Sequence, residues 1–405
     1  MWIVLVLLIR LILSFLPPMA IDQGAWRAWS ARMAEFGPAK FYSTEVFTDN
    51  PPGFLYIFWF LGEVKNKLLP NVSYTSPGFD FLLKLPNNLA DLGTGWLIYL
   101  LIKRKRSDSW AKAGFLLYTL NPSVIFNTSI FGQFDGSGTL FAVLAVYALV
   151  VYKRPELTGL FFAISWAIKP QTIALAPALG LLILISSKPI KWILTGLSFL
   201  GTTLLIYWPF FPTNPISGIF QISERMVKLY TCTTCFAFNF WGLFDNWRND
   251  TNPFLGLPLV GWGMILLGLS YIFILFRRPF SKHYREPYLY TTIALSVLAF
   301  FNFLTRMHER YVFSFFAFFL LGAMLLKSKK LLAFYLFFSL FNTLNIYFPY
   351  ATYTTELKLT PDLLKWLSQN FRWLSGIGFA SFLILFVGIE KIISTPSRQS
   401  NLQKA

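Results

Sequence analysis

The stretch FLGLPLVGWGMILLGLSYIFILFRR (residues 254–278) decides the fold class of this chain. Residues 254–276 hold no charged side chain, and Arg277-Arg278 follow directly. A helix needs about 20 consecutive apolar residues to cross the hydrocarbon core of a bilayer. Apolar blocks of comparable length recur along the sequence, so we expect an all-α polytopic membrane protein.

The overall composition agrees with this expectation. Hydrophobic residues make up 55% of the 405 residues and charged residues 13%, and the mean hydropathy is +0.55. Soluble domains carry about 25% charged residues, roughly twice this share. No obvious repeat or low-complexity tract divides the chain, and we interpret residues 1–391 as a single membrane domain.

The net charge of +17 indicates orientation in a membrane rather than binding of nucleic acid. The basic residues cluster in short segments between the apolar blocks: Lys103–Arg106, Lys153-Arg154, Lys188 with Lys191, Arg277-Arg278, and Lys327 with Lys329-Lys330. Cytoplasmic loops of membrane proteins carry such an excess of Lys and Arg. No basic, aromatic-interleaved soluble module is present to hold a nucleic acid, and none is expected among the partners.

The same clusters decide the position of an ambiguous apolar run, residues 53–64. About a dozen apolar residues are too few for a span and suit a surface-lying helix. If the run crossed the membrane, the next helix would place Lys103–Arg106 outside, whereas otherwise all basic clusters share one side. We therefore expect a first extracytoplasmic loop at about residues 19–78, cytoplasmic termini, and a disordered cytoplasmic tail at 392–405.

The apolar blocks predict about twelve transmembrane helices in a multi-pass protein. We expect a bacterial inner membrane as its location rather than the endoplasmic reticulum. The predicted spans are residues 2–16, 79–102, 110–126, 136–152, 157–168, 172–187, 192–210, 254–276, 287–304, 311–326, 331–348 and 373–391.

With this topology, the charged and polar residues that are not cytoplasmic gather at the extracytoplasmic face. Asp22 directly follows the first span and is a candidate general base for an acceptor hydroxyl, or else a helix N-cap. Asp49, before two prolines, either orients substrate or belongs to a turn. Asp135, with Gln133 close by in the sequence, either supports catalysis or caps the following helix. A transporter would more often hold its ionisable residues near the midplane of repeated halves.

Basic and aromatic residues at the same face suit a phosphate and a sugar. Lys169, between two apolar runs, could bind a phosphate or extend its amine to the interface. Arg306, His308 and Arg310 are dense enough for a phosphate or pyrophosphate site, the alternative being a plain charged turn. Trp241 could stack on a sugar ring or belong to an interfacial aromatic belt.

The two cysteines and two histidines of the chain argue against a structural zinc site. Cys232 and Cys235 form a lone C-x-x-C. Because the βαβ context of a thioredoxin-like centre is missing, we expect a local disulfide or two idle thiols.

In their order along the chain, six segments resemble the GT-C class of polyprenyl-phosphate-sugar-dependent glycosyltransferases. They are IDQGAWRAW (21–29), FTDNPPGFLY (47–56), NPSVIFNTSIFGQFD (121–135), IKPQTIALAP (168–177), FNFWGLF (238–244) and TRMHERY (305–311). Within the class, the chain looks closest to the glucosyltransferases of asparagine-linked glycan assembly and to the mannosyltransferases acting on glycosylphosphatidylinositol anchors, with their bacterial relatives.

The resemblance implies an inverting transfer of a hexose, mannose before glucose, from a polyprenyl-phosphate donor to a hydroxyl of a glycan, glycolipid or protein. It implies Asp22 as the catalytic base, and Lys169, His308, Arg306 and Arg310 as ligands of the donor phosphate. It also implies surface-lying helices in the first outer loop. The first loop lacks a D-x-D motif, so no catalytic metal and no cofactor other than the donor are expected. A polymerase or ligase of lipid-linked glycans and a transporter or flippase remain the alternatives.

Overall fold

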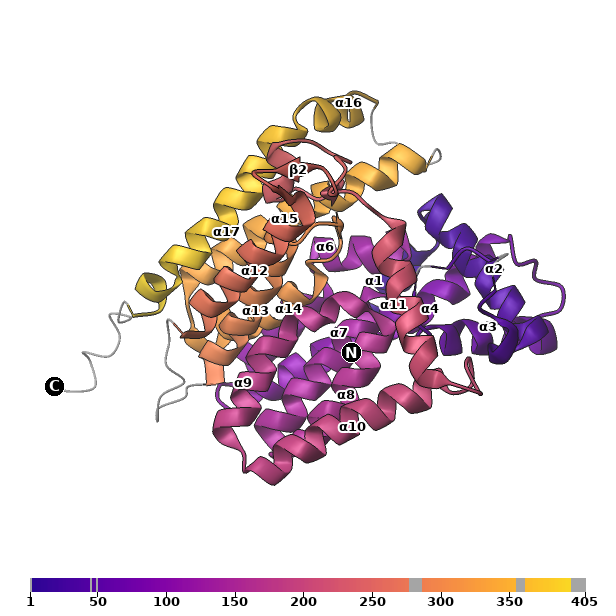
Figure 1. The fold of residues 1–405 in the computed structure, drawn as a ribbon, viewed down its shortest axis with the longest axis horizontal. Coiled ribbons are helices and arrows are strands. Elements are labelled where there is room, and N and C mark those ends of the chain that lie inside the picture. The colour runs from indigo at the N-terminus through magenta and orange to yellow at the C-terminus, as the bar shows by residue number, and fades with distance from the viewer. Residues whose placement is uncertain (1, 44–45, 49, 277–285, 355–360, 395–405) are drawn as a thin grey trace.

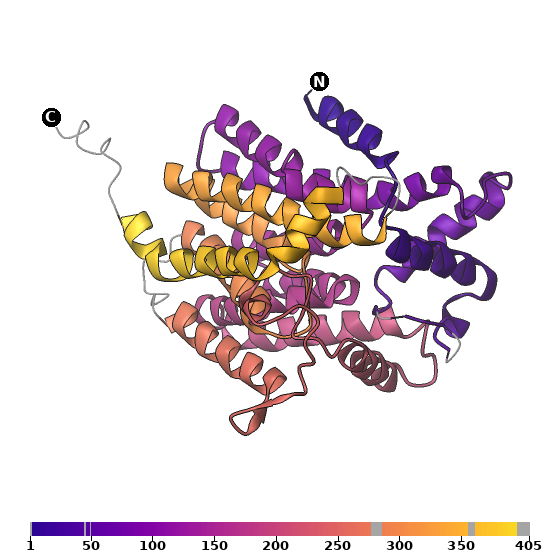
Figure 2. The same cartoon turned by 90° about the horizontal axis from the view of Figure 1, so that it is seen from above.

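The computed structural model describes residues 2–43, 46–48, 50–276, 286–354 and 361–394 of the chain. These residues form an all-α protein, as the sequence predicts, with four two-residue strands in its loops (Figures 1 and 2). The first half holds α1 (Trp2–Ser14), α2 (Ala20–Phe36), α3 (Leu55–Leu68), α4 (Pro77–Lys103), α5 (Asp108–Thr119), α6 (Pro122–Ile125), α7 (Asp135–Tyr147), α8 (Pro155–Ile168), α9 (Ala176–Ser186) and α10 (Pro189–Tyr207). The second half holds α11 (Pro215–Leu229), β1 (Thr234–Cys235), β2 (Pro253–Phe254), β3 (Leu257–Pro258), α12 (Leu259–Phe276), α13 (Glu286–Phe303), β4 (Met307–His308), α14 (Phe313–Leu326), α15 (Lys329–Tyr353), α16 (Pro361–Gln369) and α17 (Phe371–Ser394).

Short helical turns of other types join several of these elements. They are the 3₁₀ segments η1 (Pro38–Lys40), η4 (Pro170–Leu175) and η5 (Phe240–Leu243), and the π segments η2 (Phe126–Phe131) and η3 (Ala148–Tyr152). The strands pair in two places, β1 with β4 in parallel and β2 with β3 antiparallel.

Five helical stretches among the described residues are long and apolar enough to cross a membrane. They are Asp135–Tyr152, Pro189–Tyr207, Leu259–Phe276, Lys329–Tyr353 and Phe371–Ile389. The predicted count of about twelve spans is not confirmed, although each predicted span overlaps described helix. In the predicted span 254–276, the helix begins only at Leu259, because the residues before it form the β2–β3 hairpin. Several of those helices are short: the 14 residues of α8 extend only about 21 Å, against about 30 Å of hydrocarbon.

The predicted span at 110–126 is shorter than expected because Asn121 and Pro122 start a new helix. The Asn121 side chain accepts hydrogen bonds from the backbone N–H groups of Ser123 and Val124, at 2.9 and 3.2 Å. Proline has no N–H and is well tolerated in the first turn of a helix. The last helix is instead longer than predicted, since α17 extends past the predicted boundary at 391 to Ser394. The rest of the predicted tail, residues 395–405, lies outside the described residues.

The core of the bundle lies around α13 and α14, whose residues are almost all buried. The two helices pack against each other, α14 also contacts α7, and α8 packs between α7 and α10. Because α7 and α8, and likewise α13 and α14, are consecutive and antiparallel, their connections alternate between two ends of the bundle. We call the end that bears Lys105 and Arg106 the basic end and the opposite end the Asp22 end.

A buried ion pair fixes the first helix to the bundle. Arg10, fully buried in α1, pairs with the fully buried Asp91 of α4. It also donates to Asn88 Oδ1 at 3.0 Å and to the carbonyl oxygen of Thr119 at 2.7 Å. Breaking a buried pair leaves an uncompensated charge, at a cost of about 3–5 kcal/mol. This network therefore explains how an arginine is accommodated within an apolar helix.

The first outer loop folds as a small aromatic unit beside the bundle. Helices α2 and α3 pack on each other around Trp26, Trp29 and Phe58, and lie on one side of the molecule in both views (Figures 1 and 2). The ambiguous apolar run thus forms a helix, α3, that packs on α2; its position at a bilayer surface stays a prediction. The approach of this unit to α8 requires a glycine at 53, since a Cβ there would lie 2.5 Å from the carbonyl of Ala167.

The loop between α10 and α12 has more structure than the sequence indicates. It contains α11, an amphipathic helix with exposed Ile216 and Phe220, and the disulfide between Cys232 and Cys235. Of the two alternatives expected for these cysteines, a local disulfide or two idle thiols, the structure has the disulfide. Next to it, β1 pairs with β4 so that Cys235 lies opposite His308.

Candidate functional site

A cavity of about 600 Å³ opens at the Asp22 end, between the α2–α3 unit, α11 and the bundle. Its lining includes five of the residues predicted from the sequence: Asp22, Gln133, Lys169, Arg306 and Arg310. They come from four connections that are far apart in the sequence, and the antiparallel packing of the helices brings them to one place. The structure thus assembles most of the predicted site around one space.

Asp22 lies in the first turn of α2, where the positive end of the helix dipole stabilises a carboxylate. It is not the N-cap, a position that Met19 occupies. Its Oδ2 accepts a hydrogen bond from Gln133 Nε2 and lies 3.7 Å from Arg310 Nη2. Among the described contacts none uses Oδ1, and the side chain is 20% exposed. An oriented carboxylate with one oxygen open to the cavity is the geometry that a general base needs.

Gln133 connects the acidic and the basic side of the cavity. Its amide nitrogen donates to Asp22, and its amide oxygen accepts from Lys169 Nζ at 3.3 Å. The side chain is fully buried. Gly132 before it has φ +92°, and a Cβ there would meet Gln23 Oε1 at 2.8 Å. Glycine is favoured in this left-handed conformation, and the turn places Gln133 between its two charged partners.

Lys169 is a buried cation at the end of α8 rather than a lysine that extends its amine to an interface. Its Nζ lies 3.6 Å from Asp135 Oδ2 and 4.0 Å from the centre of the Phe134 ring. Asp135, at the start of α7, also accepts from Gln171 Nε2 at 2.9 Å and from Asn127 Nδ2 at 3.3 Å. Asp135 is therefore absent from the cavity wall but fixes the amine of Lys169 that reaches it.

Arg310 is held between two carboxylates. Its Nη1 donates to Glu309 Oε1 at 2.9 Å, and its Nη2 faces Asp22. Glu309 is 1% exposed, and burial raises the pKa of its carboxyl group above the usual value. The buried Arg310 Nε has no hydrogen-bond partner among the described residues.

Arg306 already has a carboxylate partner that the sequence did not indicate. Its Nε donates to Asp250 Oδ2 at 2.7 Å and its Nη2 to Asp250 Oδ1 at 3.2 Å, in a bidentate pair. Asp250 is fully buried, and Thr305 also donates to it. No local pattern could have pointed to Asp250, because it lies in the long loop and meets Arg306 only through tertiary packing.

His308 lies next to the cavity but is not part of the described lining. Its ring contacts those of Tyr230 and Tyr311, with centres 5.1 and 5.2 Å away. Burial lowers the pKa of His308 well below 6.5, and the charges of Arg310 and Lys169 add to this shift. At neutral pH the ring is therefore uncharged, so it can donate one hydrogen bond but adds no positive charge to the site.

Two further predicted residues are placed elsewhere or fall outside the described part of the chain. The Trp241 indole is buried and donates to the carbonyl oxygen of Phe303 at 2.7 Å, away from the cavity lining. Asp49 lies outside the described residues, although Phe47 and Asn50 on either side of it line the cavity. Within the described ranges, no group of three or more His, Cys, Asp or Glu side chains could hold a metal ion.

Much of the remaining cavity wall is apolar, although Asn50, Gln171 and Ser223 also line it. Trp26 and Trp166 contribute indole rings, while Met264 and Phe300 come from α12 and α13. Met264 is 57% exposed, and Val227 of α11 is 58% exposed. The cavity therefore continues onto an apolar surface beside α11 and α12, where a hydrocarbon chain could lie against the protein.

No known family model matches the chain, and no curated protein is significantly similar to it in sequence. The functional argument therefore depends on the cavity. Its charged groups could bind an anionic group with Lys169 and Arg310, and could take a proton from a hydroxyl with Asp22. Its apolar wall could hold a lipid chain at the same time.

Proposed function

We propose that the chain is an inverting glycosyltransferase, which moves a hexose from a polyprenyl-phosphate donor to an acceptor hydroxyl on the extracytoplasmic face. Mannose is the favoured sugar and glucose the second. The observation that carries the proposal is the composition of the cavity: one described carboxylate lines it, Asp22, together with three cationic side chains and a wide apolar wall.

The reaction follows from these groups. The acceptor oxygen attacks the anomeric carbon while Asp22 Oδ1 takes its proton. The bond from that carbon to the phosphate oxygen breaks, and polyprenyl phosphate leaves with the electron pair. Lys169 and Arg310 stabilise the charge that develops on the phosphate, which is usually the largest single contribution to catalysis.

Gln133 and the neutral His308 have supporting parts in this mechanism. Gln133 orients both the base and Lys169, so it couples proton removal to binding of the phosphate. His308, next to the cavity, is neutral and therefore adds no charge to the site. Arg306 lines the cavity while it remains paired with Asp250. Its guanidinium is therefore held in place and contributes positive electrostatic potential to the cavity rather than a mobile ligand.

The test is transfer of radiolabelled sugar from polyprenyl-phosphate-mannose and polyprenyl-phosphate-glucose by membranes that hold equal amounts of protein. Asp22→Asn keeps the shape of the side chain and should reduce transfer about 10²–10⁴-fold. Glu35→Gln is the matched control, because Glu35 is an exposed carboxylate of the same helix outside the cavity.

Equal transfer by wild type and Asp22→Asn would remove Asp22 from the mechanism. Absence of transfer from both donors by wild-type protein, with a folded chain, would contradict the proposed activity. Transfer from a lipid-diphosphate glycan instead would favour the polymerase or ligase alternative.

A further inference from the structure

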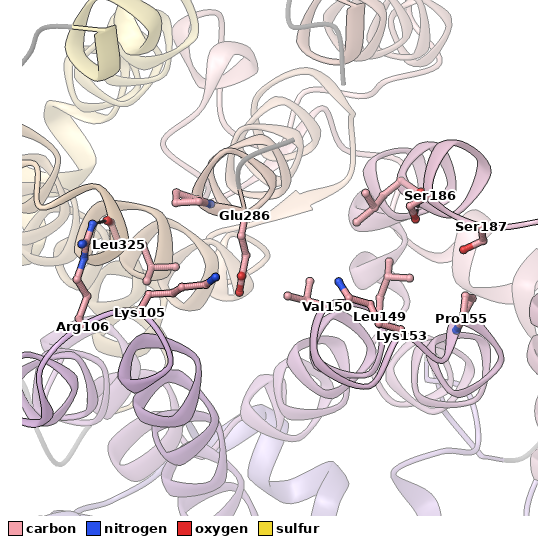
Figure 3. Close-up of a pocket in the computed structure, with 12 residues that line it drawn as sticks. Lys105, Arg106, Leu149, Val150, Lys153, Pro155, Ser186, Ser187, Glu286 and Leu325 are labelled. Carbon is pink, nitrogen blue, oxygen red and sulfur yellow. Dashed lines mark hydrogen bonds between the residues drawn. The ribbon is translucent and has the colours of Figure 1, made fainter. Parts of the chain in front are cut away.

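A second cavity, of about 680 Å³, lies at the basic end, opposite the proposed active site (Figure 3). It is bordered by the residues that follow α4, by the connection between η3 and α8, by the end of α9, and by the facing ends of α13 and α14. The mechanism proposed above uses none of these residues.

Three cationic side chains converge on this space. Lys105 and Arg106 follow α4, and Lys153 occupies a left-handed turn with φ +55° after η3. In Figure 3 the amines of Lys105 and Lys153 point toward each other from opposite sides of the cavity. Among the described residues no carboxylate lies within ion-pair distance of either lysine.

The third cation and the one described acidic lining residue are fixed by other contacts. Arg106 donates to the carbonyl oxygen of Leu325, while its buried Nε has no partner among the described residues. Glu286 pairs with Arg104 at 3.0 Å and accepts from the hydroxyl of Tyr290 at 2.9 Å. In Figure 3 the Glu286 carboxylate lies between the two lysines, but it is within ion-pair distance of neither. With three cations and one carboxylate, the described lining retains an excess of positive charge.

The other sides of the cavity suit a lipid. Leu149, Val150 and Leu182 form an apolar wall, and Ser186 and Ser187 add hydroxyl groups at the end of α9. The neighbouring side chains are exposed and apolar: Tyr152, Leu184 and Ile185 are 60%, 50% and 47% exposed. An amphiphile could thus place an anionic group on the lysines and its chains on this surface.

We propose that this cavity binds a phosphate group, carried in the membrane by the headgroup of an anionic lipid. Basic pockets between membrane helices on the cytoplasmic side are suited to such headgroups, since they combine positive charge with contact to the acyl region. The cavity lies at the end where the basic loops of the chain collect, which is the cytoplasmic side by the charge pattern. This proposal does not depend on glycosyl transfer, because its readout is binding.

The test uses the full chain purified in detergent and measures lipid binding by native mass spectrometry. The probes are phosphatidylglycerol and phosphatidylcholine with the same acyl chains, with inorganic phosphate as a competitor. The variant Lys105→Gln/Lys153→Gln removes the two lysines of the cavity. The control Lys329→Gln/Lys330→Gln removes the same charge from exposed positions at the start of α15, outside the lining.

Wild type should prefer phosphatidylglycerol, and the cavity variant should bind it roughly 10- to 30-fold more weakly, as expected for two lysines near an anionic headgroup. The control should stay within about 2-fold of wild type. An equal loss in both variants, or in neither, would overturn the proposal. So would equal binding of the two lipids. Displacement of phosphatidylglycerol by phosphate supports recognition of the phosphate group, whereas binding of phosphate without binding of the lipid would overturn the lipid as its carrier.

Discussion

Arg310 Nη2 lies 3.7 Å from Asp22 Oδ2, so that the connection between α13 and α14 reaches the first turn of α2. The same guanidinium binds Glu309, and Asp22 also binds Gln133. This chain of contacts places the proposed base, a cation and a second carboxylate around one cavity. Each contact leads to a prediction that can be tested separately.

Removing Arg310 should damage stability and transfer for different reasons. Arg310→Ala leaves Glu309 buried without its partner, at a cost of about 3–5 kcal/mol in the free energy of unfolding. Arg310→Ala/Glu309→Ala removes both charges and should recover most of that stability while transfer stays low. Thermal unfolding in detergent and the transfer assay measure the two effects, with the exposed Arg248→Ala as a control. Recovery of transfer in the double variant would show that Arg310 acts only in folding.

Gln133 should act as a positioning residue. In Gln133→Ala, Asp22 and Lys169 both lose a charge-assisted hydrogen bond, worth about 1.5–3 kcal/mol, so kcat/KM should fall by about 10- to 150-fold. Gln133→Glu places a second carboxylate at Asp22 Oδ2 and should lower the rate further. Steady-state kinetics with varied donor checks both variants, and Gln221→Ala, on the exposed side of α11, is the control. A change in thermal stability with unchanged kcat and KM would refute this role.

The stability of the fold should depend on pH through His308. Its pKa is lowered in the folded protein, so below about pH 6.5 the unfolded chain binds more protons than the folded one. Stability is therefore present above the unfolded pKa and is lost as the pH falls below it, by up to about 1.4 kcal/mol per pH unit.

In His308→Gln, the free energy of unfolding should fall less than in wild type between about pH 6.5 and 5.5. The raised pKa of Glu309 has the opposite sign, because its folded carboxyl group holds a proton at a pH where the unfolded one does not. The difference between wild type and His308→Gln in thermal unfolding isolates the contribution of the histidine. Parallel curves for the two proteins would show that His308 is not held neutral.

The disulfide gives an independent test of orientation. Cys232 and Cys235 are bonded, and disulfides persist in oxidising compartments outside the cytoplasm. Because both cysteines are buried, the labelled residue on this side should be a cysteine introduced by Thr251→Cys, which is exposed in the same loop. A membrane-impermeant maleimide should label it in intact cells. A cysteine introduced by Ser109→Cys, exposed near the basic end, should stay unlabelled until the membrane is opened. Labelling of that cysteine in intact cells would reverse the proposed topology.

The sequence was a good guide to the helices and to part of the site. Proline, glycine and capping residues mark helix ends locally, so most predicted spans agree with observed helices to within a few residues. The polar segments at the ends of those helices must lie at one membrane face or the other. Asp22, Lys169 and Arg310 could therefore be grouped at one face without knowledge of the distances between them. The number of helices that cross a membrane did not follow, because apolar blocks such as residues 157–168 form helices too short to span one without help.

The partners of the charged groups could not be predicted in this way. Asp250 belongs to a loop with no local pattern, and it neutralises Arg306 only because β1 and β4 bring that loop to the end of α13. The sequence suggested that Trp241 could stack on a sugar ring, yet in the fold its indole donates to the carbonyl oxygen of Phe303. In both cases a long-range contact determines what the side chain touches.

The sequence by itself determined the helical class, the position of most helices and the asymmetry of charge between the two ends. These properties depend on local apolar blocks and local clusters of Lys and Arg, and they need no long-range contact. Only the tertiary structure decided which charges meet: Asp22 with Gln133 and Arg310 at one end, and Lys105 opposite Lys153 at the other. The reason is physical, because ion pairs and cavities depend on distances of a few ångströms between segments that the sequence leaves far apart.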